Sequence, residues 1–315
     1  MSRHNGDLVF LQNMIEHLLK PLVSERFLNE PGYREGHLKI INALPGRRIL
    51  GVHIPEMRAL ARSLAGREDA LDLIDGFEKA AAMEKKKGYG CVGGLCYEET
   101  AVWGMMTGAL KDRQLAIRAE TSGISILESR LECVRSHVTV LDNWALCDMF
   151  VSGAKWFGKI VSKSLKTPAG SPDRTVAEKL WRFLCGYFSS EREFDVRFAT
   201  VMAMSFFLNE QYLHRIFYQF DKIEFGKIRS EYVSPSTARS AGGAARVLES
   251  GKGVAPGDPP YYVNMGVAWC LATALAKFPD DTRAYMRHSG LPEQVIRLYI
   301  RKSRESFRTR GISPL

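Results

Sequence analysis

The sequence contains three apolar helical runs, and each is interrupted by one residue suited to chemistry or recognition. These residues are Asp148, Arg197 and Trp269, which are 49 and 72 positions apart in turn. Residues 233–260 are rich in Gly, Ser, Ala and Pro, which is typical of a loop. Without these 28 residues, the second spacing is 44. Because helical repeats of the HEAT type recur at about 40–47 residues, the spacing predicts an α-solenoid of HEAT-like repeats.

No window of the sequence alternates strictly between apolar and polar residues, as a half-buried strand would. The sequence therefore predicts an all-α fold. A chain of 315 residues with 45% hydrophobic content is long enough to bury a core in one superhelical domain. The predicted helices cover residues 8–29, 33–42, 56–64, 97–110, 112–119, 122–139, 175–187, 193–208, 211–219, 262–278 and 281–287.

We expect a single HEAT-like domain over residues 1–315. Within it, residues 233–260 are expected to form a flexible insert and residues 84–95 a flexible, basic connector. Residues 297–315 are expected to form a basic C-terminal helix and tail. Six basic residues occur there against one acid, Glu305: Arg297, Arg301, Lys302, Arg304, Arg308 and Arg310.

The net charge of +9 and the isoelectric point near 9.2 favour a polyanionic partner. The basic C-terminal run is a candidate for binding phosphate groups. The structural alternative is a solvated helix face, which is the usual role of such a run. Charge alone therefore indicates a class of partner and says nothing about the fold.

The six cysteines are scattered along the chain, which is typical of a reduced, intracellular protein. Cys91 and Cys96 flank a glycine pair, but neither a second cysteine pair nor a histidine pair completes a zinc site. The glycines also lack the pattern of a phosphate-binding loop. No stretch of about 18 apolar residues and no signal peptide occurs. We expect a cytoplasmic protein without membrane association, metal or cofactor.

Residues 141–151 (LDNWALCDMFV) are the stretch most relevant to function. They predict a helix with an Asp or Asn cap, on which Trp144 and Asp148 share one face because they are four positions apart. Asp148 is surrounded in sequence by apolar residues, and burying an unpaired charge costs several kcal/mol. Asp148 is therefore a candidate functional carboxylate.

Four blocks of the sequence resemble the DNA alkylation repair family of HEAT-like glycosylases. They are residues 49–60 (ILGVHIPEMRAL), 141–151, 194–204 (FDVRFATVMAM) and 261–278 (YYVNMGVAWCLATALAKF), and the similarity extends over about residues 30–305. The order of the blocks is also that of the family. The resemblance implies an α-solenoid whose concave basic surface wraps double-stranded DNA and removes N3- or N7-alkylated purines. It also implies a monomer associated with the nucleoid.

The resemblance assigns roles to four residues of this chain. Asp148 matches the catalytic aspartate, and Trp144 matches the aromatic residue four positions before it. Arg197 and Trp269 match an arginine and a tryptophan that contact DNA. Similar enzymes are thought to act without extruding the damaged nucleotide, unlike base-flipping enzymes. Ala145 departs from the pattern, because some relatives carry a further acidic residue there.

Structural alternatives remain for each of these residues. Trp144 and Trp269 are also compatible with core aromatics, which is the commoner role of a lone helical Trp. Asp148 and Arg197 are also compatible with an ion pair between neighbouring repeats. Two other functions also fit the sequence. One is a HEAT-repeat protein that binds damaged or distorted DNA without chemistry, and the other is a HEAT scaffold for protein partners.

Overall fold

The computed structural model describes residues 15–44, 46–85, 95–168, 170–230, 232–233, 246–247 and 260–315. Over these residues the chain is almost entirely helical, which confirms the predicted all-α class. By its internal contacts the chain divides into two compact units, Met1–Ala154 and Lys155–Leu315. The predicted single domain over residues 1–315 stays a prediction.

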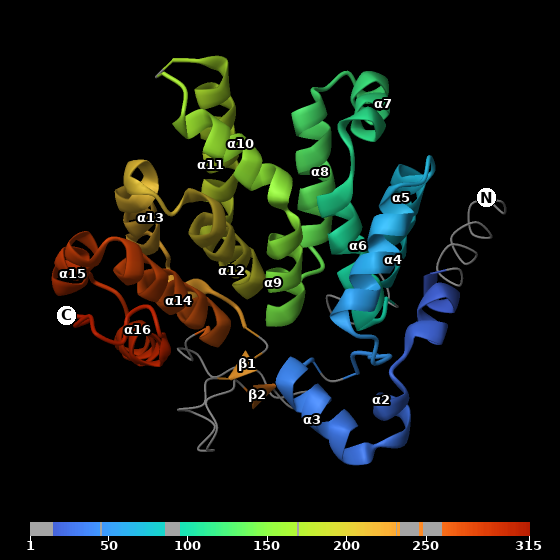
Figure 1. Cartoon of the computed structure of the whole chain (residues 1–315), viewed down its shortest axis with the longest axis horizontal. Helices are drawn as coiled ribbons and strands as arrows, with labels where there is room; N and C mark the ends of the chain where they lie inside the picture. The colour runs from blue at the N-terminus through green and yellow to red at the C-terminus, as the bar shows by residue number, and fades with distance from the viewer. Residues whose placement is uncertain are drawn as a thin grey trace. The chain divides into compact units, whose positions relative to one another are not determined.

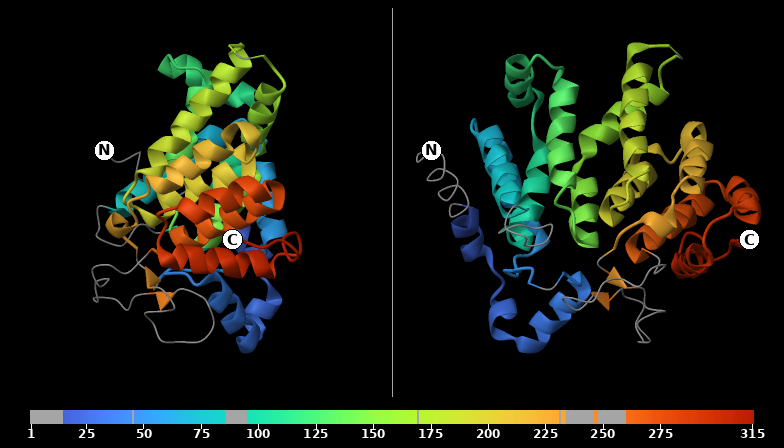
Figure 2. Two further views of the ribbon diagram at one scale, coloured as in Figure 1. Left: turned by 90° about the vertical axis from the view of Figure 1, so that its left-hand side faces the viewer. Right: turned by 180° about the vertical axis from the view of Figure 1, so that it is seen from behind.

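The first unit consists of short and medium-length helices, and α6 packs between α4 and α9. Figures 1 and 2 show these three helices side by side. The elements are a 3-10 helix at Lys20–Leu22, α2 (Glu25–Asn29), α3 (Pro31–Ile41), α4 (Ile54–Ala65), α5 (Ala70–Lys85), α6 (Tyr97–Ala109), α7 (Asp112–Ser122), α8 (Ile126–Val138) and α9 (Trp144–Gly153).

The second unit contains a similar row of neighbours, in which α14 packs between α12 and α16. Its elements are α10 (Lys155–Leu165), α11 (Pro172–Phe188), α12 (Glu193–Met202), a π-helical turn (Ala203–Phe207), α13 (Glu210–Asp221), a 3-10 helix (Phe225–Lys227), strands β1 (Tyr232–Val233) and β2 (Arg246–Val247), α14 (Tyr261–Lys277), α15 (Pro279–His288) and α16 (Glu293–Glu305). The two strands pair antiparallel.

Helix ends follow from local sequence. The Ser125 and Ser171 hydroxyls accept hydrogen bonds from backbone N–H groups at the starts of α8 and α11. Glu99 and Cys96 form a capping box at the start of α6. These side chains satisfy N–H groups that have no partner within the helix.

Two predicted flexible segments fall largely outside the described residues: most of the connector at 84–95 and most of the insert at 233–260. The beginning of the helix predicted at 8–29 also lies outside them. Within the described part of that stretch, the chain forms the 3-10 turn around Pro21 and then α2.

The basic C-terminal helix differs in its bounds from the prediction. Helix α16 begins at Glu293, four residues before the predicted 297–315 segment, and ends at Glu305. Because the helix begins earlier, Arg297 pairs with Glu293 one turn before it. In the last turn of the helix, Lys302 pairs with Glu305. Part of the basic run is therefore neutralised on its own helix.

Candidate functional site

Helix α9 carries the predicted catalytic residue and begins at a side-chain cap. The Oδ1 atom of Asn143 accepts a hydrogen bond from Ala145 N at 2.8 Å, so the predicted Asp or Asn cap is confirmed as Asn143. The last turn of α9 lies close to α6, because a Cβ on Gly108 would lie 2.8 Å from Gly153 O. The cap fixes the start of α9, and the close approach fixes its end.

Asp148 is partly exposed, whereas most of its neighbours on α9 are buried. It interacts electrostatically with the phenol of Tyr97, at the start of α6. The pKa of Tyr97 is raised, first by burial and then by nearby carboxylates, of which Asp148 has the smallest effect. Asp148 is therefore a partly exposed carboxylate within electrostatic range of a buried phenol.

Trp144 is also partly exposed, and its indole is held by the backbone of α3. The Nε1 atom donates to Ile41 O at 3.1 Å and to Ile40 O at 3.3 Å. One edge of the ring is therefore fixed, and the ring is not a fully buried core aromatic like Trp103. This contact joins residues about 100 positions apart.

A buried ion pair lies directly before the cap. Arg47 Nη2 is 3.9 Å from Asp142 Oδ1, and both side chains are almost fully buried. Arg47 also donates to Leu95 O at 3.2 Å and to Thr100 Oγ1 at 2.8 Å. The pair thereby connects the loop after α3 with the residue next to Asn143.

In the second unit, Arg197 lies on α12 and is only 3% exposed. Its Nη1 atom donates to Tyr262 O at 3.0 Å, and its Cζ atom lies 5.7 Å from the centre of the Tyr262 ring. Glu193, one turn earlier, interacts electrostatically with this guanidinium. The predicted contact of Arg197 with a DNA phosphate stays a prediction.

Glu193 is a residue that the sequence reasoning missed. It is 3% exposed, and its carboxylate accepts hydrogen bonds from Ser230 Oγ and, at 2.7 Å, from Tyr262 N. Burial raises the pKa of Glu193 to about 7, against the opposing effects of these donors and of Arg197. The sequence did contain a signal for this pair: a glutamate four positions before an arginine, in an apolar run, indicates that the two side chains share one helix face.

Trp269 lies on α14 and is 38% exposed, so it is not a core residue in the structure. Its backbone carbonyl accepts a hydrogen bond from Thr273 Oγ1 at 2.9 Å. An exposed indole face suits contact with a ligand, since an aromatic ring combines apolar area with a negative face. The four predicted residues thus divide between the two units: Trp144 and Asp148 lie in the first, and Arg197 and Trp269 lie in the second.

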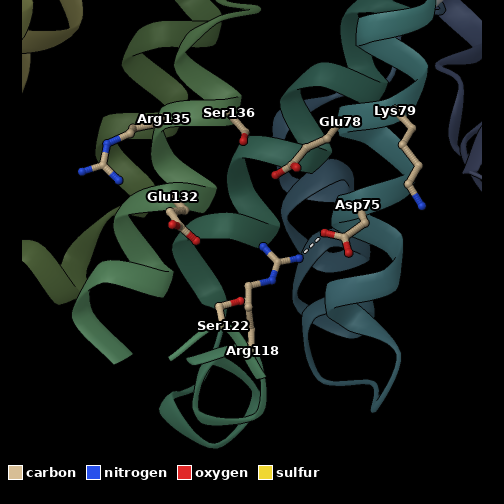
Figure 3. A pocket seen from close by; sticks show the side chains of 8 residues that line it. All are labelled: Asp75, Glu78, Lys79, Arg118, Ser122, Glu132, Arg135 and Ser136. Atoms are coloured by element: carbon tan, nitrogen blue, oxygen red, sulfur yellow. Dashed lines mark hydrogen bonds and ion pairs between the residues drawn. The ribbon is translucent and has the colours of Figure 1, made fainter. Parts of the chain in front are cut away.

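A separate cavity of about 580 Å³ lies among α5, α7 and α8 (Figure 3). Arg118 donates to the Asp75 carboxylate and, at 3.2 Å, to Cys133 Sγ. Burial raises the pKa of Glu78, another lining residue. The cavity is lined by charged and hydroxyl-bearing side chains only: Asp75, Glu78, Lys79, Arg118, Ser122, Glu132, Arg135 and Ser136. Because ligand pockets are mostly apolar, this lining is typical of a solvated hollow.

Among the described residues, His, Cys, Asp and Glu side chains form no group of three suited to a metal ion. Cys91, half of the cysteine pair considered in the sequence, lies outside them. In the part of the chain that the structure describes, every helix is too short or too polar to cross a bilayer. Comparisons of the chain with protein-family models, with curated proteins and with solved structures find no match.

Proposed function

We propose that this protein is a DNA glycosylase that hydrolyses the N-glycosidic bond of cationic N3- or N7-alkylated purines in double-stranded DNA. The observation that carries the proposal is the surface of α9. There Asp148 is a partly exposed carboxylate, and the indole of Trp144, one turn earlier, is held by two backbone carbonyls. The four sequence blocks that resemble the alkylation repair family support the same reaction.

The chemistry needs only one carboxylate. Alkylation at N3 or N7 makes the purine cationic, so the bond between C1′ and the base nitrogen breaks with its electron pair going to the base. The base leaves as a neutral molecule, and no general acid is required. This distinguishes the reaction from ordinary glycoside hydrolysis, in which two carboxyl groups act.

Asp148 has two roles in this proposal. Its negative charge stabilises the oxocarbenium character that develops on the deoxyribose. Its oxygens also orient a water molecule toward C1′ and accept the proton that the water loses when the new C–O bond forms. A carboxylate with access to solvent meets both requirements, and Asp148 has that access.

The exposed aromatic residues bind the substrate in this proposal. Trp144 presents its ring face to the sugar, where its quadrupole favours positive charge, and Trp269 offers a second aromatic surface for DNA. Arg197, which is buried, supports the start of α14 by donating to Tyr262 O. We further propose that the two rows of neighbouring helices are HEAT-like repeats of one α-solenoid, and that the protein acts as a monomer at the nucleoid.

The direct test is release of methylated bases from alkylated double-stranded DNA. Wild-type protein should release 7-methylguanine or 3-methyladenine, detected by chromatography. The Asp148→Asn variant should lose about 100- to 1,000-fold in release rate, as expected for removal of one electrostatic group, and should keep its DNA affinity. Binding without release by the wild type would instead favour a non-catalytic DNA-binding protein. Failure to bind DNA would favour a protein scaffold.

A further inference from the structure

The last turn of α3 contacts the start of α9 through side chains. Helix α3 ends at Ile41 and is followed by Asn42, whose φ of 50° places it in the left-handed region. The last carbonyls of a helix have no partner within the helix. Here Ile41 O accepts a hydrogen bond from Asn143 Nδ2 at 2.8 Å in addition to the indole N–H. The end of α3 is therefore satisfied by α9.

Asn143 uses both ends of one amide for this contact. Its Oδ1 atom caps α9 by accepting from Ala145 N at 2.8 Å, and its Nδ2 atom donates to Ile41 O. The side chain is almost completely buried. Asp would preserve the cap but has no N–H to donate when ionised. A helix cap needs only an acceptor, whereas the side chain at position 143 must both accept and donate a hydrogen bond.

The same turn of α3 sets the orientation of Trp144. An indole has one N–H donor, and here Ile40 O and Ile41 O share it. Ile41 is buried, but the two residues before it face solvent: Lys39 is exposed and Ile40 is 69% exposed. A ligand that lies against the exposed part of Trp144 therefore meets the last turn of α3 beside it.

We propose that the last turn of α3 forms one wall of the DNA-binding site, and that Asn143 is the positioning residue that holds this wall and Trp144 in place. Lys39 supplies a cation for a DNA phosphate, and Ile40 supplies an apolar surface for a deoxyribose. The inference rests on the proposed function, because it assumes that Trp144 meets DNA.

Two substitutions separate positioning from capping and from aromatic contact. Asn143→Asp retains the capping oxygen but loses the donor to Ile41 O, and Trp144→Phe retains an aromatic face but loses the indole N–H. Each should lower 7-methylguanine release from methylated double-stranded DNA by about tenfold, the factor that corresponds to one hydrogen bond. Because both act through the carbonyls of α3, their effects should not multiply. The double variant should release 7-methylguanine no more slowly than the more impaired of the two single variants.

The matched control is Asn209→Asp in the second unit. Asn209 caps α13 by accepting from Gln211 N at 3.1 Å and Tyr212 N at 3.3 Å. Asp is an equally good cap, so this variant should retain wild-type release and melting temperature. An Asn143→Asp variant that behaves like Asn209→Asp overturns the inference. So do single-variant effects that multiply in the double variant.

A binding measurement makes the inference testable without base release. Lys39→Ala leaves the fold intact because the residue is exposed. It should weaken binding of double-stranded DNA in fluorescence anisotropy and reduce the salt dependence by about one ion. If the wild type releases no base but Lys39→Ala and Asn143→Asp weaken binding, the wall is supported and the glycosylase proposal fails. Unchanged DNA affinity in both variants overturns the wall, whatever the release assay shows.

Discussion

Helices α9 and α12 each carry a candidate functional residue, Asp148 or Arg197, within an apolar run, but the surroundings of the two residues differ. On α9, Asp148 is partly exposed. On α12, Arg197 is 3% exposed, and Glu193 lies one turn before it, also buried. An apolar run thus contains a carboxylate accessible to solvent in one helix and a guanidinium held inside its unit in the other. The pattern identifies the residue, whereas the packing around it decides its exposure.

Each unit also contains a buried group whose pKa is strongly shifted, and the two shifts have opposite directions. In the first unit, His137 on α8 packs against Trp103 and Phe150, with ring centres 5.1 and 4.8 Å away. Burial lowers the pKa of His137 from 6.5 to about 3. In the second unit, burial raises the pKa of Glu193 from 4.5 to about 7. Burial favours the neutral form in both, so the contributions of His137 and Glu193 to stability should change with pH in opposite directions.

The largest expected effect is the pH dependence due to His137. The unfolded chain binds a proton near pH 6.5 and the folded chain only near pH 3. The contribution of neutral His137 to the free energy of unfolding is therefore complete above pH 6.5 and is lost as the pH falls toward 3. At about 1.36 kcal/mol per pH unit the loss reaches about 5 kcal/mol. His137→Phe should remove this slope in urea unfolding between pH 4 and 7, and an unchanged slope would contradict the assignment.

Removing Arg197 should have the next largest effect. Arg197→Met leaves the Glu193 carboxylate buried without its cation and Tyr262 O without this donor. Breaking a buried pair in this way lowers the free energy of unfolding by about 3–5 kcal/mol. Urea unfolding at pH 8 measures the loss. Adding Glu193→Gln to Arg197→Met should recover part of it, and purely additive losses would show that the two residues are not coupled.

The pH dependence due to Glu193 should be smaller and opposite in sign to that of His137. Its folded pKa is raised, so the stability contribution is complete below pH 4.5 and is lost as the pH rises toward 7. The loss amounts to about 3 kcal/mol. The free energy of unfolding of Glu193→Gln, relative to wild type, should therefore rise between pH 4.5 and 7. A constant difference across this range would place the titration elsewhere.

The smallest expected effects come from two helical glycines. Gly108→Ala places a Cβ 2.8 Å from Gly153 O, so α6 and α9 must separate, at a cost of about 1–3 kcal/mol. Gly186→Ala on α11 of the second unit meets nothing within 4 Å and should stabilise that helix by about 0.5–1 kcal/mol. Thermal unfolding compares both variants. Equal melting temperatures would show that the α6–α9 contact can adapt.

Local sequence was sufficient to predict most of the helices and the cap on α9. Apolar periodicity and the absence of strand alternation predicted the all-α class. This was possible because the apolar residues of one helix face are only three or four positions apart in the sequence. The LDNW stretch predicted a cap of Asp or Asn, and the structure has Asn143 there. Trp144 and Asp148 also followed from local sequence, because a spacing of four fixes a shared helix face.

Only the tertiary structure decided what surrounds these residues. Asn143 meets a carbonyl 102 positions earlier in the chain, and Glu193 accepts from a backbone N–H 69 positions later. Likewise, the exposure of Asp148 and the burial of Arg197 depend on which helices pack against α9 and α12. Local spacing contains no information about such long-range contacts, because they form only when distant segments bury their surfaces together. The sequence therefore determined which residues are candidates, and the packing determined their partners and their access to solvent.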